Sequence, residues 1–317
     1  MSVPVRNANP RWNSPENLSA WKKSISPQRD RLQSRMMVWL YAPLLATLTF
    51  AFAFITYVVN TSPGSRHTFF PFVIAAVSAT FALLTISLRA TNVFAGITGG
   101  TICFCLTFAS SVLVLVPESL FHTALPALFC MVVCTVGATR WNRKKKERYG
   151  LAEAKSGRRT SQIIANLGIA VAVLVLPYCP FADPAIWGPL TLTACIAALA
   201  EAAGDTVSSE LGQALRGHTL LFPSLEAVAP GTDGGISMGG TLSGLAAAAL
   251  VVATAIPTLH LSALQCGIAY SAAITGLFAD SLLGATLERR GWIGNDLVNF
   301  SSTAIAAGVA LLLGRLL

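Results

Sequence analysis

Four carboxylates lie in or beside apolar runs of this sequence. Glu201, Asp205 and Glu210 fall at the end of the run IWGPLTLTACIAALAEAAG, and Asp280 lies in FADSLLG near the end of another run. A charged group in hydrocarbon is costly unless water, a partner or a ligand compensates it. Mg²⁺ is held by one or two carboxylates together with phosphate oxygens and water. We therefore predict that Asp205, Glu210 and Asp280 are catalytic and bind Mg²⁺ or nucleotide phosphate; the alternative is that they only mark the water interface.

The spacing of these carboxylates predicts the shape of the helix that carries them. Glu201 and Asp205 are four residues apart and share a helix face, whereas Asp205 and Glu210 are five apart. Asp205 and Glu210 reach one site only if the helix ends or bends near Gly204. We therefore expect a broken helix at this position.

A glycine-rich loop follows in GTDGGISMGG. Backbone amides in such a loop can cradle a phosphate, because glycine lets a ligand approach closely. The loop lacks the Lys-Ser/Thr ending of a P-loop, which excludes that motif. The residues that we expect to bind phosphate here are Gly231, Thr232, Asp233, Gly234 and Gly235.

Other glycines are spaced for helix packing. Gly240 and Gly244 are four residues apart, the small-xxx-small spacing that lets helices approach closely in lipid. We also assign Gly96, Gly99 and Gly100 to packing in preference to phosphate contact.

Basic and amide side chains complete the candidate site. Arg158 and Arg159 open the segment GRRTSQIIAN, and arginine suits bidentate phosphate contact. We expect both to neutralise phosphate charge; the alternative is that they only set membrane topology, which is the role we assign to residues 144–146. Asn166 needs a partner such as a carboxylate or the substrate if its amide is buried. Further polar groups expected at the site are Ser209, Asn295 and Asn299.

Composition places the chain in a membrane. Hydrophobic residues make up 54% and charged residues 11% of the 317 residues, whereas soluble domains carry about 25% charged residues. The net charge of +8 does not indicate nucleic-acid binding, because the basic residues lie beside apolar runs and form no stripe with aromatics. The seven cysteines form no CxxC pair, which argues against a structural metal site or disulfides.

Apolar stretches of about 20 residues, long enough to cross a bilayer, recur along the chain. They predict an all-α polytopic membrane protein with about nine transmembrane helices, at residues 38–59, 69–88, 93–116, 119–138, 161–177, 186–204, 238–256, 262–283 and 298–314. With a cytoplasmic N-terminus, 20 of the 22 Lys and Arg residues fall on the cytoplasmic side, as the positive-inside rule requires. This orientation puts the acidic motifs and the glycine loop at the cytoplasmic leaflet.

The chain divides into a tail and one membrane domain. Residues 1–37 carry four prolines and seven Lys or Arg with little hydrophobic periodicity, which predicts a mobile basic cytoplasmic tail. The charged stretch is too long for a cleaved signal peptide. Residues 38–317 form the multi-span membrane domain.

Four ordered motifs carry a family resemblance over residues 80–317. The series GRRTSQIIAN, AGDTVSSELG, GTDGGIS and FADSLLGATLERRG with NDLVNFSS resembles the DUF92 family of integral membrane proteins, which includes the animal transmembrane protein 19 and the plant and cyanobacterial phytyl-phosphate kinases. The resemblance implies transfer of a phosphoryl group from a nucleoside triphosphate, CTP, to a prenyl monophosphate. The family's loop usually reads GTNGG, so Asp233 puts a carboxylate where an amide is expected.

We therefore expect a membrane-embedded prenyl-phosphate kinase that uses Mg²⁺ and a nucleoside triphosphate, with membrane lipids and a prenyl monophosphate as partners and no nucleic acid. The acceptor carries its nucleophilic oxygen as an anion, so no catalytic histidine is needed. One alternative is an ion-coupled transporter, whose coupling residues should lie near the midplane of the membrane. Another is a non-catalytic membrane scaffold, which leaves the acidic motifs unexplained.

Overall fold

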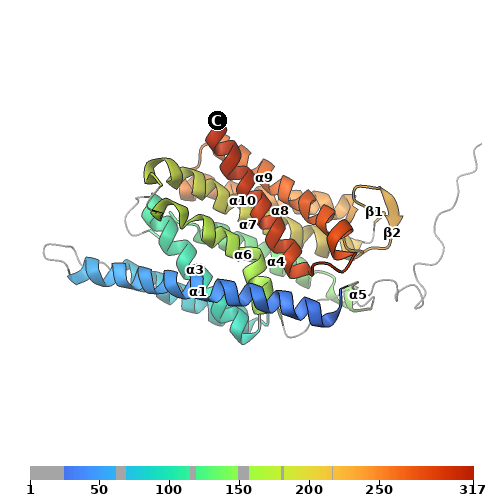
Figure 1. Ribbon diagram of the computed structural model, residues 1–317, viewed down its shortest axis with the longest axis horizontal. Coiled ribbons are helices and arrows are strands. Elements are labelled where there is room, and N and C mark those ends of the chain that lie inside the picture. The colour runs from blue at the N-terminus through green and yellow to red at the C-terminus, as the bar shows by residue number, and fades with distance from the viewer. Residues whose placement is uncertain (1–24, 62–68, 115–118, 149–156, 180–181, 216) are drawn as a thin grey trace, which may run out of the picture.

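The computed structural model describes residues 25–61, 69–114, 119–148, 157–179, 182–215 and 217–317. Helices make up most of this part of the chain, and a small sheet lies at one end (Figure 1). In chain order the elements are α1 (Pro27–Thr61), α2 (Phe70–Ser87), α3 (Val93–Val114), α4 (Leu125–Arg140), α5 (Arg143–Arg148), α6 (Thr160–Val173), η2 (Leu176–Tyr178), α7 (Pro184–Leu215), β1 (Thr219–Leu221), β2 (Glu226–Val228), β3 (Gly235–Ser237), α8 (Met238–Leu259), α9 (Ala263–Leu283), the π-helical turn η3 (Gly284–Glu288) and α10 (Asn295–Leu316).

Hydropathy alone locates the membrane helices well. Seven helices of the described chain are long and apolar enough to cross a bilayer, and α4 and α6 are shorter apolar helices. Each of the nine stretches expected from the sequence overlaps one of these helices. However, α6 has 14 residues, which extend about 21 Å, less than the roughly 30 Å of a hydrocarbon core. The helical membrane fold is confirmed, whereas the count of nine spans and the orientation stay predictions.

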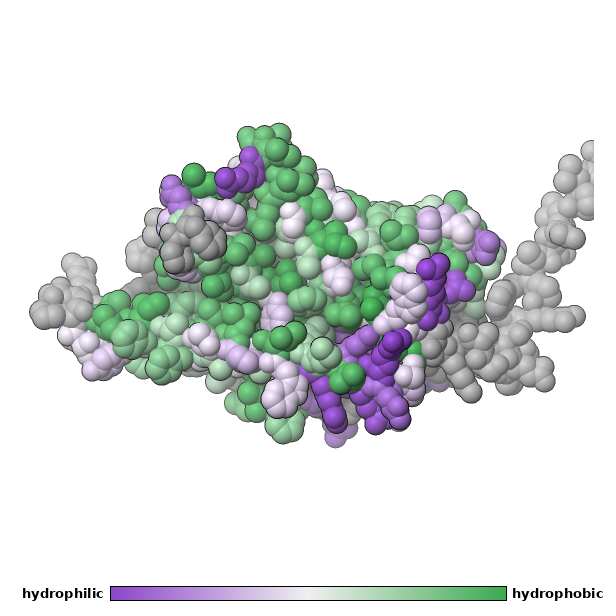
Figure 2. All heavy atoms as spheres, in the orientation of Figure 1, coloured by the Kyte–Doolittle hydropathy of each residue, from purple (hydrophilic) through white to green (hydrophobic). Residues whose placement is uncertain are grey.

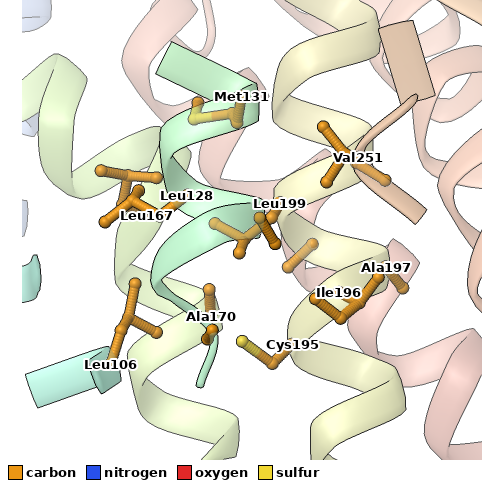
Figure 3. Packing of buried hydrophobic residues seen from close by; sticks show 14 of the residues in the cluster. Leu106, Leu128, Met131, Leu167, Ala170, Cys195, Ile196, Ala197, Leu199 and Val251 are labelled. Carbon is orange, nitrogen blue, oxygen red and sulfur yellow. The ribbon is translucent and has the colours of Figure 1, made fainter. Parts of the chain in front are cut away.

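Helix α7 runs through the centre of the bundle. It packs against α4, α6, α8, α9 and α10, and nearly all of its residues from 191 to 207 are buried. Figure 3 shows Ile196 and Leu199 of α7 among Leu128 and Met131 of α4 and Val251 of α8. The helix that carries two of the candidate carboxylates is thus fixed by its neighbours on almost every side.

The expected break of α7 near Gly204 is wrong, because the helix is continuous from Pro184 to Leu215. A Cβ at Gly244 would lie 2.6 Å from the Gly204 carbonyl oxygen, and a Cβ at Gly240 would lie 2.6 Å from the Ser208 carbonyl oxygen. Gly240 and Gly244 therefore allow close contact between α8 and α7, and Gly204, whose own Cβ position is 3.2 Å from Gly244 O, lies in this contact without ending the helix. The assignment of Gly240 and Gly244 to packing agrees with this contact.

Two of the three glycines that we assigned to packing in α3 lie in close contact with α2. A Cβ at Gly96 would lie 2.3 Å from the Ile86 side chain, and one at Gly100 would lie 2.8 Å from Ala82 Cβ. These two residues let α3 pack closely against α2, as expected. Gly99 leaves more room, since the nearest atom to its Cβ position, in Phe81, is 3.8 Å away.

One end of the molecule is markedly more polar than the rest. Figure 2 shows a mainly hydrophobic face on which hydrophilic side chains gather near the start of α1, the end at which α5, β1 and β2 lie in Figure 1. Large apolar side chains such as Phe50, Leu83 and Phe94 are exposed along the helices, as expected of surfaces that face lipid. We call the end formed by residues 25–35, 140–148, 217–237 and 284–296 the polar end.

Helix α1 begins eleven residues before the expected membrane segment, so residues 27–37 of the predicted tail are helical. Polar side chains of this stretch bind the turn between η3 and α10 and the first turn of α10. Its hydrogen bonds run from Arg29 Nη1 to Gly291 O (3.1 Å), from Gln33 Nε2 to Trp292 O (2.8 Å) and from Ser34 Oγ to Asp296 Oδ2 (2.7 Å). Residues 1–24 of the predicted tail lie outside the described chain.

A three-stranded antiparallel sheet links α7 to α8, with strand order β2-β1-β3. Thr219 of β1 pairs with Val228 on one side and with Ser237 on the other. The sequence did not predict this sheet, because strands of three residues carry no readable alternation. The sheet holds the glycine loop between β2 and β3.

Candidate active site

A cavity of about 400 Å³ lies at the polar end, between the ends of α7 and α9, the starts of α6 and α10, and the sheet. It is lined by nearly all of the residues expected at the site, which come from five separate parts of the chain. These are Arg158, Asp205, Ser209, Glu210, Gly231, Thr232, Asp233, Gly234, Gly235, Asp280, Asn295 and Asn299. The fold therefore brings the sequence motifs to one place, although their chemical roles stay predictions.

Two helices begin at this cavity. The first residues of α6 and α10 follow Arg159 and Gly294, and a helix N-terminus carries unpaired amides and a partial positive charge. Anions are stabilised near such ends. The cavity thus offers an anion a favourable electrostatic setting in addition to the charge of Arg158.

Asp205 of α7 and Asp280 of α9 form a carboxyl pair on the cavity wall. Their side chains interact with each other, and the Arg158 guanidinium interacts electrostatically with Asp205. Asp280 Oδ1 is buried and has no hydrogen-bond partner among the described residues. Two neighbouring carboxylates repel each other unless a proton or cation compensates them, so this pair suits a bound divalent cation.

Glu201 lies one helical turn deeper in α7 and is 1% exposed. Its side chain fits beside Gly276 of α9, where a Cβ would come within 2.6 Å of Glu201 Cγ, and it interacts with Ser302 of α10. Glu201 and Asp205 therefore share a helix face, as their spacing predicts, and Glu201 extends the acidic wall into the bundle.

Glu210 has a different partner. Lys146 of α5 is 1% exposed and forms an ion pair with the Glu210 carboxylate. Its ammonium group also donates to the carbonyl oxygens of Ala138 (3.0 Å) and Thr139 (2.8 Å) at the end of α4. Assigning Lys146 to topology alone was wrong, because its buried side chain joins α4 to α7. Residues 144 and 145 are exposed, and Lys145 Nζ donates to Ala214 O (2.8 Å) near the end of α7.

The expected carboxylate trio is thus divided. On a continuous helix, residues five apart differ in direction by about 140°, which turns Glu210 toward Lys146 while Asp205 faces Asp280. No three His, Cys, Asp or Glu side chains in the described ranges are grouped around one possible metal position. A carboxylate pair remains compatible with Mg²⁺, which completes its coordination with phosphate oxygens and water.

Arg158 and Arg159 point to different partners. Arg158 lines the cavity, whereas Arg159 does not and instead has its Nη2 3.7 Å from Asp296 Oδ2. The Arg159 amide also donates to Gln162 Oε1 (2.7 Å) at the start of α6. Arg158 is therefore the better placed of the two to neutralise a phosphate, and Arg159 helps to hold α6 beside α10.

The glycines of the loop bring it close to the end of α9. A Cβ at Gly234 would lie 2.3 Å from the Ala285 amide nitrogen, and the residue has a φ of +75°. Gly235 donates its amide to Thr232 O (2.8 Å), and Thr232 donates its amide to Ala229 O (3.2 Å). Close backbone packing thus explains why glycine occupies positions 234 and 235, and no bound phosphate is needed to explain it. The expected phosphate contact of this loop stays a prediction.

Asn166 and Asn299 meet on the cavity wall. Asn166 Nδ2 donates to Gln162 O (2.8 Å), and Asn299 Nδ2 is 3.5 Å from Asn166 Oδ1. The partner expected for Asn166 is therefore another amide, and the pair joins α6 to α10.

The family match covers every residue that lines this cavity. The family described as Integral membrane protein DUF92 matches residues 73–307, about three quarters of the chain. The chain belongs to the DUF92 family. Helix α1 precedes the matched region, so the polar end combines family elements with one helix from outside the match.

Three relatives are similar over about half of this chain. An uncharacterized membrane protein of Synechocystis is 31% identical over 178 residues, 55% of this chain and 67% of its own length. Protein VTE6, chloroplastic, of Arabidopsis thaliana is 26% identical over 184 residues, 57% of this chain and 55% of its own length. An uncharacterized membrane protein of Methanocaldococcus jannaschii is 34% identical over 168 residues, 52% of this chain and 69% of its own length. No solved structure matches.

Several cavity residues of this DUF92 protein were not foreseen. They include Gln162, Thr206, Ser208, Gln213, Ser281 and Glu288. A helical projection would have found some of them, since Gln162 lies one turn before Asn166 and Ser281 follows Asp280. Glu288 belongs to the π-helical turn η3, a local irregularity that is frequent at functional sites but has no clear sequence pattern.

Proposed function

We propose that this protein is a membrane-embedded prenyl-phosphate kinase. It transfers a phosphoryl group from a nucleoside triphosphate, CTP by family resemblance, to a prenyl monophosphate. The observation that carries the proposal is the cavity at the polar end, which combines Arg158, Asp205 and Asp280 with two helix starts. Its volume of about 400 Å³ lies in the range of small-molecule sites. Membership of the DUF92 family and the distant similarity to Protein VTE6 support it.

In this proposal, charged and polar residues of the cavity bind Mg²⁺ and the phosphates. Asp205 and Asp280 would hold Mg²⁺, which neutralises charge that develops on the transferred group. Arg158 and the starts of α6 and α10 attract the phosphates. Asn166, with its Asn299 partner, offers polar contacts on the same wall. Glu210 remains paired with Lys146 and fixes the end of α7.

The reaction needs no protein nucleophile. A phosphate oxygen of the prenyl monophosphate forms a bond to the γ-phosphorus, and the bond between that phosphorus and the β–γ bridging oxygen breaks. The products are a prenyl diphosphate and a nucleoside diphosphate, and charge balances without a proton when the acceptor is a dianion. Catalysis then consists of positioning and charge stabilisation.

The polar end faces the cytoplasm in this proposal. Residues 140–148 carry six Lys or Arg in the short connection after α4, and such connections are enriched in basic residues on the cytoplasmic side. Nucleoside triphosphates are then available to the cavity from the same side.

The test is a transfer assay on purified protein in nanodiscs. Labelled CTP, ATP, GTP or UTP is incubated with Mg²⁺ and prenyl monophosphates of several chain lengths, and prenyl diphosphate is measured by mass spectrometry. We expect transfer that chelation with EDTA abolishes and that Asp280→Asn lowers about 100-fold to 1,000-fold, the usual loss when a charge-stabilising group is removed. Asp183→Asn is the matched control, because Asp183 is exposed before α7 and lines no wall of the cavity.

Two results would contradict the proposed kinase site. If no nucleotide and lipid pair gives a diphosphate, while liposomes show ion flux that Asp280→Asn removes, the protein is a transporter and the kinase proposal is wrong. Equal turnover of Asp280→Asn and Asp183→Asn would show that the carboxyl pair is not the catalytic centre.

A further inference from the structure

A second, narrower pocket adjoins the cavity between α2, α3, α4 and α6. Its inner wall is mainly apolar and includes Phe81, Met131, Val132, Ile163 and Leu167. Along α4 the lining runs from Thr139 to Met131, a depth of about 12 Å at 1.5 Å per residue. The volume of about 70 Å³ admits one slender chain and excludes a bulky group.

The mouth of this pocket is strongly cationic. Arg89, Arg140, Arg143 and Arg158 all line it, and they come from the α2–α3 turn, the end of α4, the start of α5 and the residues before α6. Arg143 forms an ion pair with Glu147 (3.1 Å), and Arg140 donates one hydrogen bond to Leu88 O (2.6 Å). In the described part of the chain no carboxylate pairs with Arg89 or Arg140. Such a concentration of positive charge favours an anion with several acceptor oxygens.

The backbone sets the position of two of these arginines. The Arg158 amide donates to Ala90 O (2.9 Å), and the Asn92 amide donates to Arg158 O (3.1 Å). This bridge brings the α2–α3 turn, with Arg89, against the residues that precede α6. Gly157 permits the contact, because it has a φ of +76° and a Cβ there would lie 2.8 Å from Arg89 O. The cationic mouth is therefore built by main-chain pairing and does not depend on flexible side chains alone.

The pocket and the cavity share a wall. Arg158 and Asn166 line both. An anion at the mouth of the pocket therefore lies beside the cavity that contains Asp205 and Asp280. A group bound in one space is a neighbour of a group bound in the other.

We propose that the pocket is the acceptor site, which binds a single-chain lipid phosphomonoester with its phosphate among Arg89, Arg140 and Arg158. The start of the hydrocarbon chain lies against Met131 and Leu167, and the remainder lies in the surrounding lipid. This assignment rests on the proposed kinase function and adds where the acceptor binds. Arg158 then contacts the acceptor phosphate on the side that faces the nucleotide.

Ordinary bilayer phospholipids fit this pocket less well. They carry two acyl chains and a phosphodiester with one negative charge, whereas the pocket is narrow and its mouth brings together four cations. A phosphomonoester has more charge and more free oxygens for bidentate contact with arginine.

Direct binding tests the assignment separately from catalysis. Labelled prenyl monophosphate is titrated into protein in phosphatidylcholine nanodiscs without nucleotide, and CTP binding with Mg²⁺ is measured in parallel. We expect the double variant Arg89→Gln, Arg140→Gln to weaken lipid binding at least about tenfold, since it removes two charge-assisted contacts. Its CTP affinity should stay within about twofold, which also shows that the variant is folded. The double variant Arg31→Gln, Arg35→Gln removes the same charge from exposed positions of α1 and should leave both affinities unchanged.

A second pair of variants tests the apolar wall. At Gly99 the nearest neighbours of an added Cβ, in Phe81 and Ile163, are 3.8 and 3.9 Å away, so Gly99→Ala should be tolerated. Gly99→Leu fills the pocket and should weaken prenyl monophosphate binding without changing CTP binding. Inorganic phosphate and phosphatidylglycerol serve as competitors that carry the charge without the single prenyl chain.

The outcomes separate the two proposals. Equal lipid affinity in the two double-arginine variants, or equal competition by phosphatidylglycerol or inorganic phosphate, would overturn the acceptor site. Arginine-dependent binding without diphosphate formation would retain the site and refute the kinase. Diphosphate formation with an unchanged KM for the lipid in Arg89→Gln, Arg140→Gln would retain the kinase and refute the site.

Discussion

Replacing Lys146 with methionine removes the cation that joins α4, α5 and α7. The Lys146 side chain is 1% exposed and the Glu210 side chain 12% exposed, so most of the pair is shielded from water. Breaking a buried ion pair by removing one partner costs about 3 to 5 kcal/mol. The carbonyl oxygens of Ala138 and Thr139 also lose a donor, at about 1 kcal/mol each. Because the cavity lets some water reach Glu210, we expect a loss of about 4 kcal/mol.

The measurement is the free energy of unfolding in mixed micelles, obtained from an SDS titration followed by circular dichroism. Lys144→Met is the matched control, because it removes the same charge from an exposed position of α5 and should change stability by no more than about 0.5 kcal/mol. The double variant Lys146→Met, Glu210→Met removes both charges and should recover at least about 2 kcal/mol relative to Lys146→Met.

Two results would refute this reasoning. The first is an equal effect of Lys146→Met and Lys144→Met, which would show that the ion pair does not hold the bundle together. The second is additive effects of the two substitutions in the double variant, which would show that the side chains are not coupled. Transfer activity of the stabilised double variant then decides the role first expected for Glu210: loss of turnover would support a metal ligand, and retained turnover a purely structural carboxylate.

Three further substitutions test other contacts of the bundle. Gly244→Ala puts a Cβ 2.6 Å from Gly204 O and should destabilise the protein by about 1 to 3 kcal/mol. Its control, Gly308→Ala, meets no atom within 4 Å and should change stability by no more than about 1 kcal/mol. The SDS titration compares the two variants, and equal effects would contradict close α7–α8 contact. Asp296→Asn keeps a hydrogen-bond acceptor for Ser34 but removes the charge that faces Arg159. It should lower the free energy of unfolding in the same titration by about 1 to 2 kcal/mol, and a stabilised variant would show that the ion pair is unfavourable. Asp233→Asn removes a negative charge from the cavity wall and should lower the KM for the nucleotide by up to about tenfold, measured by steady-state kinetics. A raised KM would instead indicate that the Asp233 carboxylate helps to bind the nucleotide or its metal ion.

The sequence was informative about the site because a lipid solvent penalises charge. Asp205 and Asp280 stand out in runs that otherwise carry almost only apolar residues, and a charge retained there requires compensation. Hydropathy also placed the helices, since each segment must satisfy its own backbone hydrogen bonds in lipid. These two signals depend on composition within a short window, which can be read without knowing the fold.

Features that depend on side-chain direction could not be predicted in the same way. Lys144, Lys145 and Lys146 are consecutive and chemically identical, yet only Lys146 is buried. Arg158 and Arg159 are likewise adjacent in the sequence. Arg158 lines the cavity, whereas Arg159 lies beside Asp296. The continuity of α7 through Gly204 was also missed, because glycine can either break a helix or allow a close neighbour, and the neighbour is known only from the fold.

Helix α1 influences the site although its residues do not line the cavity. It lies before the family match, yet it holds the turn that leads to Asn295 through Arg29, Gln33 and Ser34. Gly294 is part of this fit, since its Cβ position is 2.2 Å from Asp30 Oδ1. A helix outside the family match thus supports the segment that leads into the cavity. A substitution in α1 can therefore move Asn295 without changing any residue of the acidic wall.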